Sequence, residues 1–72
     1  MDTLKISNMS MFNIYGLKEI CKYNRDVFSS FNYLQREDLL SLITKKIIEN
    51  ENIYRPPYIF KNKDFIRKYK QN

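Results

Sequence analysis

An apolar stripe near the middle of this 72-residue chain indicates its fold most clearly. The stripe consists of Leu39, Leu40, Leu42, Ile43 and Ile47. At about 100° per residue, these side chains gather on one side of a helix. Two acidic residues lie at its start and two lysines near its end, an arrangement that the helix dipole favours. We therefore predict a helix over residues 36–49, with Leu39, Leu40 and Ile43 in the core.

A second apolar stripe lies upstream and predicts another helix, over residues 14–23. It consists of Ile14, Leu17, Ile20 and Cys21. Spacings of three and four residues place these side chains on one helical face. Ser10 or Asn13 can cap the start of this helix with a side-chain oxygen. Gly16 lies early in the helix, where it costs about 1 kcal/mol of stability relative to alanine.

Residues 25–35 join the two predicted helices and are also rich in apolar side chains. Phe28, Phe31 and Leu34 have helical spacing, so a short middle helix is one interpretation. The other interpretation is an extended segment that lays the same three side chains into the cleft between the helices. We favour a helical turn followed by an extended piece.

The segments outside the helical pair have less regular patterns. Residues 1–9 mix polar and apolar side chains, which predicts either a loose arm or a short strand that pairs with another segment. Pro56 and Pro57 forbid a helix and favour an extended, polyproline-like strap. A last short helix is predicted near residues 63–70.

Together these patterns predict an all-α fold: a small domain of two to four helices, a Pro-containing extended strap and a basic C-terminal tail. We place the helical domain at residues 1–54 and the strap and tail at residues 55–72. A chain of this length buries only about 60% of the surface that it exposes when unfolded. We therefore expect one core and marginal stability.

A short pattern that spans both predicted helices carries one family resemblance. Residues 17–22 read Leu-Lys-Glu-Ile-Cys-Lys, and after an extension come Leu34, Arg36 and the Asp-Leu-Leu of residues 38–40. This pattern resembles the helix-extension-helix group, which contains SAP domains and the similar N-terminal module of the transcription terminator Rho. The extension here lacks the glycine that the group usually carries. The resemblance implies a small nucleic-acid-binding module.

A second resemblance covers the linker and the start of the second predicted helix. Residues 27–34 read Val-Phe-Ser-Ser-Phe-Asn-Tyr-Leu, and residues 37–42 read Glu-Asp-Leu-Leu-Ser-Leu. This stretch is similar to the middle of an F-box, although the usual opening Leu-Pro pair is missing. The resemblance implies a protein-interaction adaptor that docks through Leu34, Leu39 and Leu40.

The excess positive charge of the chain lies at its C-terminal end. Residues 1–54 contain seven basic and seven acidic residues, a net charge of zero. Residues 55–72 contain six basic residues and one acidic residue, a net charge of +5. This asymmetry favours an anionic partner, most often DNA or RNA, because each neutralised phosphate releases a counterion. The alternative is a solvated basic tail. The candidate nucleic-acid-binding residues are Lys18, Lys22, Arg36, Arg55, Lys61, Lys63, Arg67, Lys68 and Lys70.

A protein partner in a larger complex is the competing hypothesis. The chain would then be an adaptor of the F-box type, or a small structural subunit of a virion or another multisubunit complex. The strap either packs its aromatic side chains over the helices or binds an aromatic-lined groove on the partner. The candidate partner-binding residues are Leu34, Leu39, Leu40, Tyr54, Pro56, Pro57 and Tyr58.

The residue types that most catalytic and metal sites require are scarce. The chain has no histidine and a single cysteine, Cys21, so it cannot fill a tetrahedral zinc site. Cys21 lies on an apolar helical face, which predicts a buried thiol. We expect no catalytic site, no metal and no cofactor, and thus no enzymatic activity. No apolar run approaches the about 20 residues that span a bilayer, so we expect no membrane partner.

Cysteine use and the N-terminus predict an intracellular location, in the cytoplasm or the nucleus. No disulfide can form within the chain, and acidic Asp2 is not followed by the apolar region of a signal peptide. Asn, Lys, Ile and Tyr are abundant and Ala is absent. This bias indicates an AT-rich genome, which leaves viral, protist and bacterial sources open.

Overall fold

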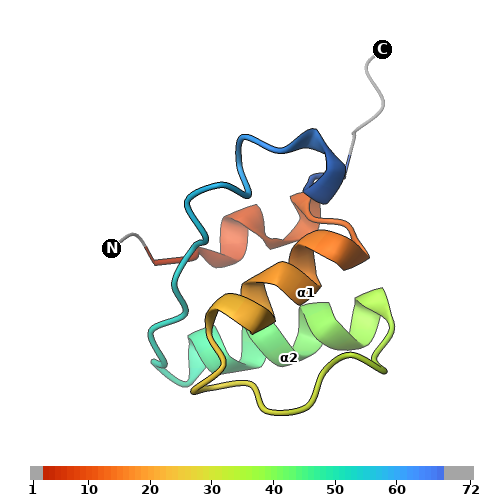
Figure 1. Cartoon of the computed structure of the whole chain (residues 1–72). Helices are drawn as coiled ribbons and strands as arrows, with labels where there is room; N and C mark the ends of the chain where they lie inside the picture. The colour runs from red at the N-terminus through yellow and green to blue at the C-terminus, as the bar shows by residue number, and fades with distance from the viewer. Residues whose placement is uncertain (1–2, 68–72) are drawn as a thin grey trace.

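The computed structural model describes residues 3–67 and confirms the all-α prediction (Figure 1). Two α-helices, α1 (Ile14–Tyr23) and α2 (Arg36–Ile48), pack against each other. Two short 3-10 helices, η1 (Ile6–Met11) and η2 (Lys63–Phe65), contact α2 and α1 respectively. No strand forms in the part of the chain that the structure describes, where β-pairing is limited to isolated bridges.

The two α-helices begin and end close to the predicted residues. The first covers the predicted range, and Asn13 caps it: its side-chain oxygen accepts a hydrogen bond from the amide of Gly16 at 2.9 Å. The second ends at Ile48, one residue earlier than predicted. Asn50 follows with a φ of 68°, the left-handed conformation that often ends a helix. Local start and stop signals therefore define both helices.

The linker forms a helical turn and then a non-helical segment, which confirms the favoured interpretation over a middle helix. The carbonyl of Asn24 accepts hydrogen bonds from the amides of Val27 and Phe28, at 2.9 and 3.1 Å. Phe28 and Phe31 then enter the core, where their exposed fractions are 3% and 6%. The linker thus runs across the two helices with its aromatic side chains inward.

The N-terminal segment corrects the sequence prediction. A loose arm is wrong, because the amide of Leu4 donates to the carbonyl of Ile53 at 2.7 Å and Thr3 forms a β-bridge with Tyr54. The predicted pairing with another segment is present, but the chain then turns into η1 and no strand results. Leu4 and Met9 are buried, and their removal from water stabilises this arrangement.

The core draws on every part of the described chain. Its buried apolar residues are Leu4, Met9, Phe12, Leu17, Ile20, Cys21, Phe28, Phe31, Leu39, Ile43, Ile53 and Ile59. Pro56 is buried as well. Among the predicted core positions of α2, Leu39 and Ile43 are fully buried, whereas Leu40 is only partly buried. The C-terminal segment therefore contributes to the same core as the helices.

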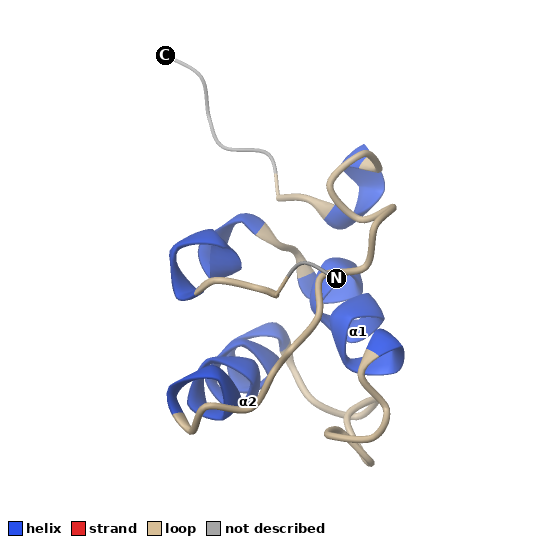
Figure 2. Ribbon diagram, turned by 90° about the vertical axis from the view of Figure 1, so that its left-hand side faces the viewer, coloured by secondary structure: helices blue, strands red, loops and turns tan. Residues whose placement is uncertain are grey.

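Residues 55–67, called the strap below, run along α1 in the opposite direction (Figure 1; Figure 2 gives the view turned by 90°). Just before the strap, Tyr54 pairs with Asn24 at the end of α1. Farther along, Tyr58 bonds to Glu19 in the middle of the helix. Near its end, the carbonyl of Phe65 accepts a hydrogen bond from the amide that precedes the helix. The strap is therefore attached to α1 at three successive levels.

Gly16 allows this close approach at the N-terminal end of α1. A Cβ atom at this position would overlap the backbone carbonyl oxygen of Phe65. A backbone atom cannot move aside as the end of a flexible side chain can. Gly16 is therefore more than the weak helix former that the sequence suggests, because its missing side chain makes room for the strap.

Candidate nucleic-acid interface

The strap lies alongside α1, and we call the region where the two segments meet the α1–strap seam. Its exposed or half-buried residues on the two segments are Tyr15, Lys18, Glu19, Lys22, Tyr23, Tyr58, Lys61, Lys63 and Arg67. The hydroxyl of Tyr58 donates to Oε1 of Glu19 at 2.9 Å, which joins the two segments in the middle of the seam. The Nδ2 of Asn13 donates to the carbonyl of Asp64 at 2.7 Å and joins them at one end.

Asn24 positions the other end of the strap, and sequence reasoning missed this role. Its side chain is 1% exposed and behaves like a segment of backbone. The Oδ1 atom accepts from the amide of Tyr54 at 2.8 Å, and Nδ2 donates to the carbonyls of Tyr54 and Ile20 at 3.0 and 2.7 Å. The available signal was an asparagine at a position that continues the apolar stripe of the helix.

Most of the predicted phosphate-binding residues lie on the seam. Lys61, Lys63 and Arg67 are exposed on the strap, and Lys18 and Lys22 lie one helical turn apart on α1. Lys22 also forms an ion pair with Glu19 at 3.1 Å. Helix α1 and the strap together contain six cations, Arg55 included, and two carboxylates, those of Glu19 and Asp64, which gives these two segments a net charge of +4. Lys68 and Lys70, predicted to bind phosphates too, lie outside the described residues.

Arg36 was predicted to bind phosphate, but its guanidinium is used inside the fold. Its Nε donates to the carbonyl of Phe12 at 2.9 Å, and its Nη2 donates to the carbonyl of Ser10 at 3.1 Å. Its Nη1 contacts the carboxylate of Glu37 at 3.2 Å. These bonds satisfy carbonyls at the end of η1, so Arg36 connects α2 to η1, and its phosphate binding stays a prediction.

Arg55 also makes an intramolecular contact. Its guanidinium carbon lies 4.6 Å from the centroid of the Phe60 ring, within the range of a cation–π interaction. The Phe60 ring in turn meets the ring of Phe12 edge to face at a centroid distance of 5.3 Å. Arg55 therefore helps to hold the strap against the core. In this role it differs from Lys61, Lys63 and Arg67, the other predicted cations of the strap.

The predicted partner-binding residues do not form one exposed surface. Leu39 and Pro56 are buried and offer no docking surface in this conformation. The partly buried members are Leu34, Leu40 and Tyr54. Pro57 and Tyr58 are exposed on the strap, away from the leucines of α2. The structure therefore divides this set between the core and two separate segments.

Exposed tyrosine rings on the seam are a feature that sequence reasoning did not identify. The exposed fractions are 64% for Tyr15, 38% for Tyr23 and 44% for Tyr58. The Tyr58 ring meets Phe65 edge to face at a centroid distance of 6.3 Å. Partial burial, together with the hydrogen bond and the charge of Glu19, raises the pKa of Tyr58, so its hydroxyl remains a donor at neutral pH.

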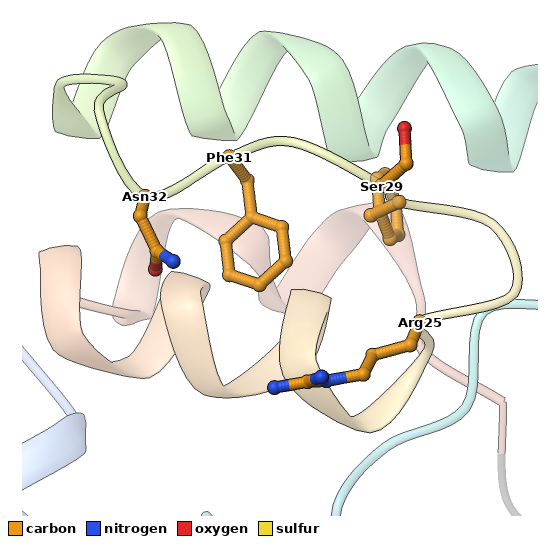
Figure 3. Close-up of a pocket in the computed structure, with 5 residues that line it drawn as sticks. Arg25, Ser29, Phe31 and Asn32 are labelled. Atoms are coloured by element: carbon orange, nitrogen blue, oxygen red, sulfur yellow. The ribbon is translucent and has the colours of Figure 1, made fainter.

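Two hollows lie elsewhere on the surface. The first, of about 280 Å³, lies beside the linker and is lined by Arg25, Phe28, Ser29, Phe31 and Asn32. In Figure 3 the Phe31 ring points toward α1, whereas the Ser29 hydroxyl points away from Arg25. The second, of about 560 Å³, is an open depression on α2 beside Leu40 and Ile48. The first lining contains no carboxylate, and the second contains one, that of Glu49, together with Lys45.

Residues 3–67 contain neither a cluster of metal-ligating side chains nor a membrane-spanning helix. No group of three His, Cys, Asp or Glu side chains gathers there to hold a metal ion. Burial raises the pKa of the Cys21 thiol to about 12, so the thiol stays protonated and unreactive near neutral pH. In the same range, the helices are too short or too polar to cross a bilayer.

Comparison of the chain with protein-family models, curated proteins and solved structures finds no significant match in any of the three. The chemistry of the α1–strap seam is therefore the basis for a functional hypothesis.

Proposed function

We propose that this chain is a small, non-enzymatic, intracellular nucleic-acid-binding module that holds phosphates at the α1–strap seam. One observation carries the proposal: Lys61, Lys63 and Arg67 are exposed on a segment that is fastened to the start of α1. Because the backbone that bears these cations is anchored, little conformational freedom of the chain is lost when they bind. Lysine and arginine are also the usual partners of phosphate.

The seam cations set the strength expected of this binding. Each phosphate that a cation neutralises adds about 0.9 to the slope of log affinity against log salt for a duplex, and about 0.7 for a single strand. The ion pair of Lys22 with Glu19 reduces its availability. About four contacts would then give a slope between about −3 and −4.

The competing hypothesis, a protein-interaction adaptor or a structural subunit, has less support. Its proposed contacts include Leu39 and Pro56, which the core already uses. The resemblances to helix-extension-helix modules and to the F-box stay predictions. A protein partner remains the outcome to expect if the charged seam binds no nucleic acid.

A matched pair of variants tests the proposed function. Lys61→Gln/Lys63→Gln removes two exposed cations from the seam, and Lys45→Gln/Lys46→Gln removes the same charge from the end of α2. Fluorescence anisotropy with a short random duplex and a short random single strand would give affinity across salt. We expect the seam variant to weaken binding to all sequences and to lower the slope by about 1.4–1.8.

The α2 variant should keep most of the affinity, since its lysines lie on α2 and not on α1 or the strap. Absence of binding to both probes at about 50 mM salt would refute the proposal. Equal losses in the two variants would refute it too, because the affinity would then depend on net charge and not on the seam.

A further inference from the structure

The exposed tyrosine rings of the α1–strap seam are typical of a ligand-binding surface. An aromatic side chain that lies half in water leaves a large apolar surface exposed, and such rings are common at binding sites. Tyr15, at 64%, is among the most exposed large apolar side chains in the described chain. It lies on the helix that carries Lys18 and Lys22. At about 100° per residue these three side chains fall within about 60° of one another, so a ring and two cations share one side of α1.

The spacing of the rings suits an extended ligand. Tyr15 and Tyr23 are eight residues apart on α1, which separates them by about 12 Å along the helix axis and about 80° around it. Tyr58 is bonded to Glu19, which is halfway between them in sequence. Position 19 lies about 6 Å along the helix axis from each of the two tyrosines, so the Tyr58 hydroxyl reaches α1 between the turns that carry them.

Tyr58 is also preorganised. Its hydroxyl is held by Glu19 at 2.9 Å, and its ring rests against Phe65. A ring that is already fixed loses less side-chain freedom when a ligand stacks on it. The carboxylate of Glu19 would repel a phosphate, but its charge is engaged by Lys22 and by the Tyr58 hydroxyl. The middle of the seam therefore suits a flat, uncharged group, and its edges suit anions.

We infer that the α1–strap seam binds single-stranded nucleic acid, with bases stacked on Tyr15, Tyr23 and Tyr58 and phosphates held by the lysines and the arginine that flank them. This inference rests on the proposed function and narrows its substrate. Bases of a single strand can splay onto aromatic rings, and stacking tolerates any sequence because every base has a π-face. The bases of a duplex are already stacked inside it.

Tyr15→Ala is the decisive substitution, with Tyr33→Ala as its control. Tyr33 is 75% exposed but lies in the linker. The control substitution therefore removes a comparable ring from another part of the surface. The probes are an oligothymidylate, an abasic strand of the same length and a short duplex. We expect Tyr15→Ala to weaken binding of the oligothymidylate about 5- to 150-fold and to leave the salt slope unchanged. Binding of the abasic strand and of the duplex should stay as in the parent protein.

Intrinsic fluorescence gives a second measurement. The chain has six tyrosines and no tryptophan, so its emission reports on tyrosine alone. Oligothymidylate should quench this emission, and the abasic strand should not. If nucleic acids bind but the duplex binds as tightly as the single strand, or Tyr15→Ala and Tyr33→Ala behave alike, the stacking inference is wrong and the proposed function survives. If neither form binds, both are wrong.

Discussion

At Asn24 a single side-chain amide pairs with backbone as a neighbouring strand would. Its oxygen and nitrogen satisfy both polar groups of Tyr54, and the nitrogen also satisfies a carbonyl of α1. A buried amide is stabilising only when its partners are present, because an unpaired buried polar group costs about 1–3 kcal/mol. The position where the strap begins therefore depends on this residue.

The first prediction replaces this amide with an apolar group of similar size. Asn24→Leu leaves the amide and the carbonyl of Tyr54 without partners, so we expect the free energy of unfolding to fall by at least about 2 kcal/mol. The control, Asn32→Leu, changes an exposed linker residue and should shift stability by less than about 0.5 kcal/mol. Urea denaturation followed by circular dichroism measures both. If Asn24→Leu is as stable as Asn32→Leu, the hydrogen bonds between Asn24 and Tyr54 contribute nothing to stability.

At the scale of the elements, the sequence predicts what is local and misses what is distant. Both α-helices follow from apolar spacing, and the cap at Asn13 follows from its position just before the first of them. The bridges that join residues 3 and 12 to residues 54 and 66 leave no periodic trace, because their partners are about 50 residues away. The 3-10 helix η1 was therefore not predictable from pattern, and the packing of the strap over the helices could be predicted without the residues that attach it.

The same limit applies to the candidate site. The cations of the strap could be predicted from the charge count, which needs no geometry. The role of Arg36 could not, because its partners are the backbone carbonyls of Ser10 and Phe12, which have no sequence signature. The grouping of the exposed tyrosines could not be predicted either. Tyr58 is brought to the helix that carries Tyr15 and Tyr23 only by the path of the strap.

Attachment of the strap gives the second prediction, at Gly16. On an isolated helix Gly16→Ala would stabilise by about 1 kcal/mol, but here the new Cβ meets the carbonyl of Phe65. We expect a lower melting temperature and faster hydrogen exchange of the Arg67 amide, which donates to the carbonyl of Met11. Tyr15→Ala, one position earlier and exposed, should leave that exchange rate unchanged. A rise in melting temperature would mean that the strap does not lie this close.

The whole molecule has a single core to which the helices, the linker and the strap all contribute. Domains of this size are typically stable by only about 5–15 kcal/mol, so the loss of one core side chain is a large fraction of the total. Residues on one helix can differ sharply in this respect. Leu39 is fully buried, whereas its neighbour Leu40 is partly exposed beside the depression on α2.

The third prediction compares these two leucines. Leu39→Ala should cost about 2–5 kcal/mol and broaden or abolish the unfolding transition of the whole chain. Leu40→Ala should cost clearly less, because part of its surface already faces water. Thermal melts of the two variants, read together, measure the difference. A larger loss of stability in Leu40→Ala than in Leu39→Ala would contradict this structure, because it would mean that the Leu40 side of α2 faces the core.

The long-range bridges also determine when this protein can fold. Leu4 pairs with Ile53, and Phe12 pairs with Ile66, so the first part of the chain finds its partners only after about 50 more residues have been added. At a synthesis rate of 5–20 residues per second this takes roughly 3–10 s. During that time the N-terminal segment can contact α1 and α2 but lacks the pairing partners that lie near residues 53 and 66. The fold of a nascent chain therefore closes only once the strap has emerged from the ribosome.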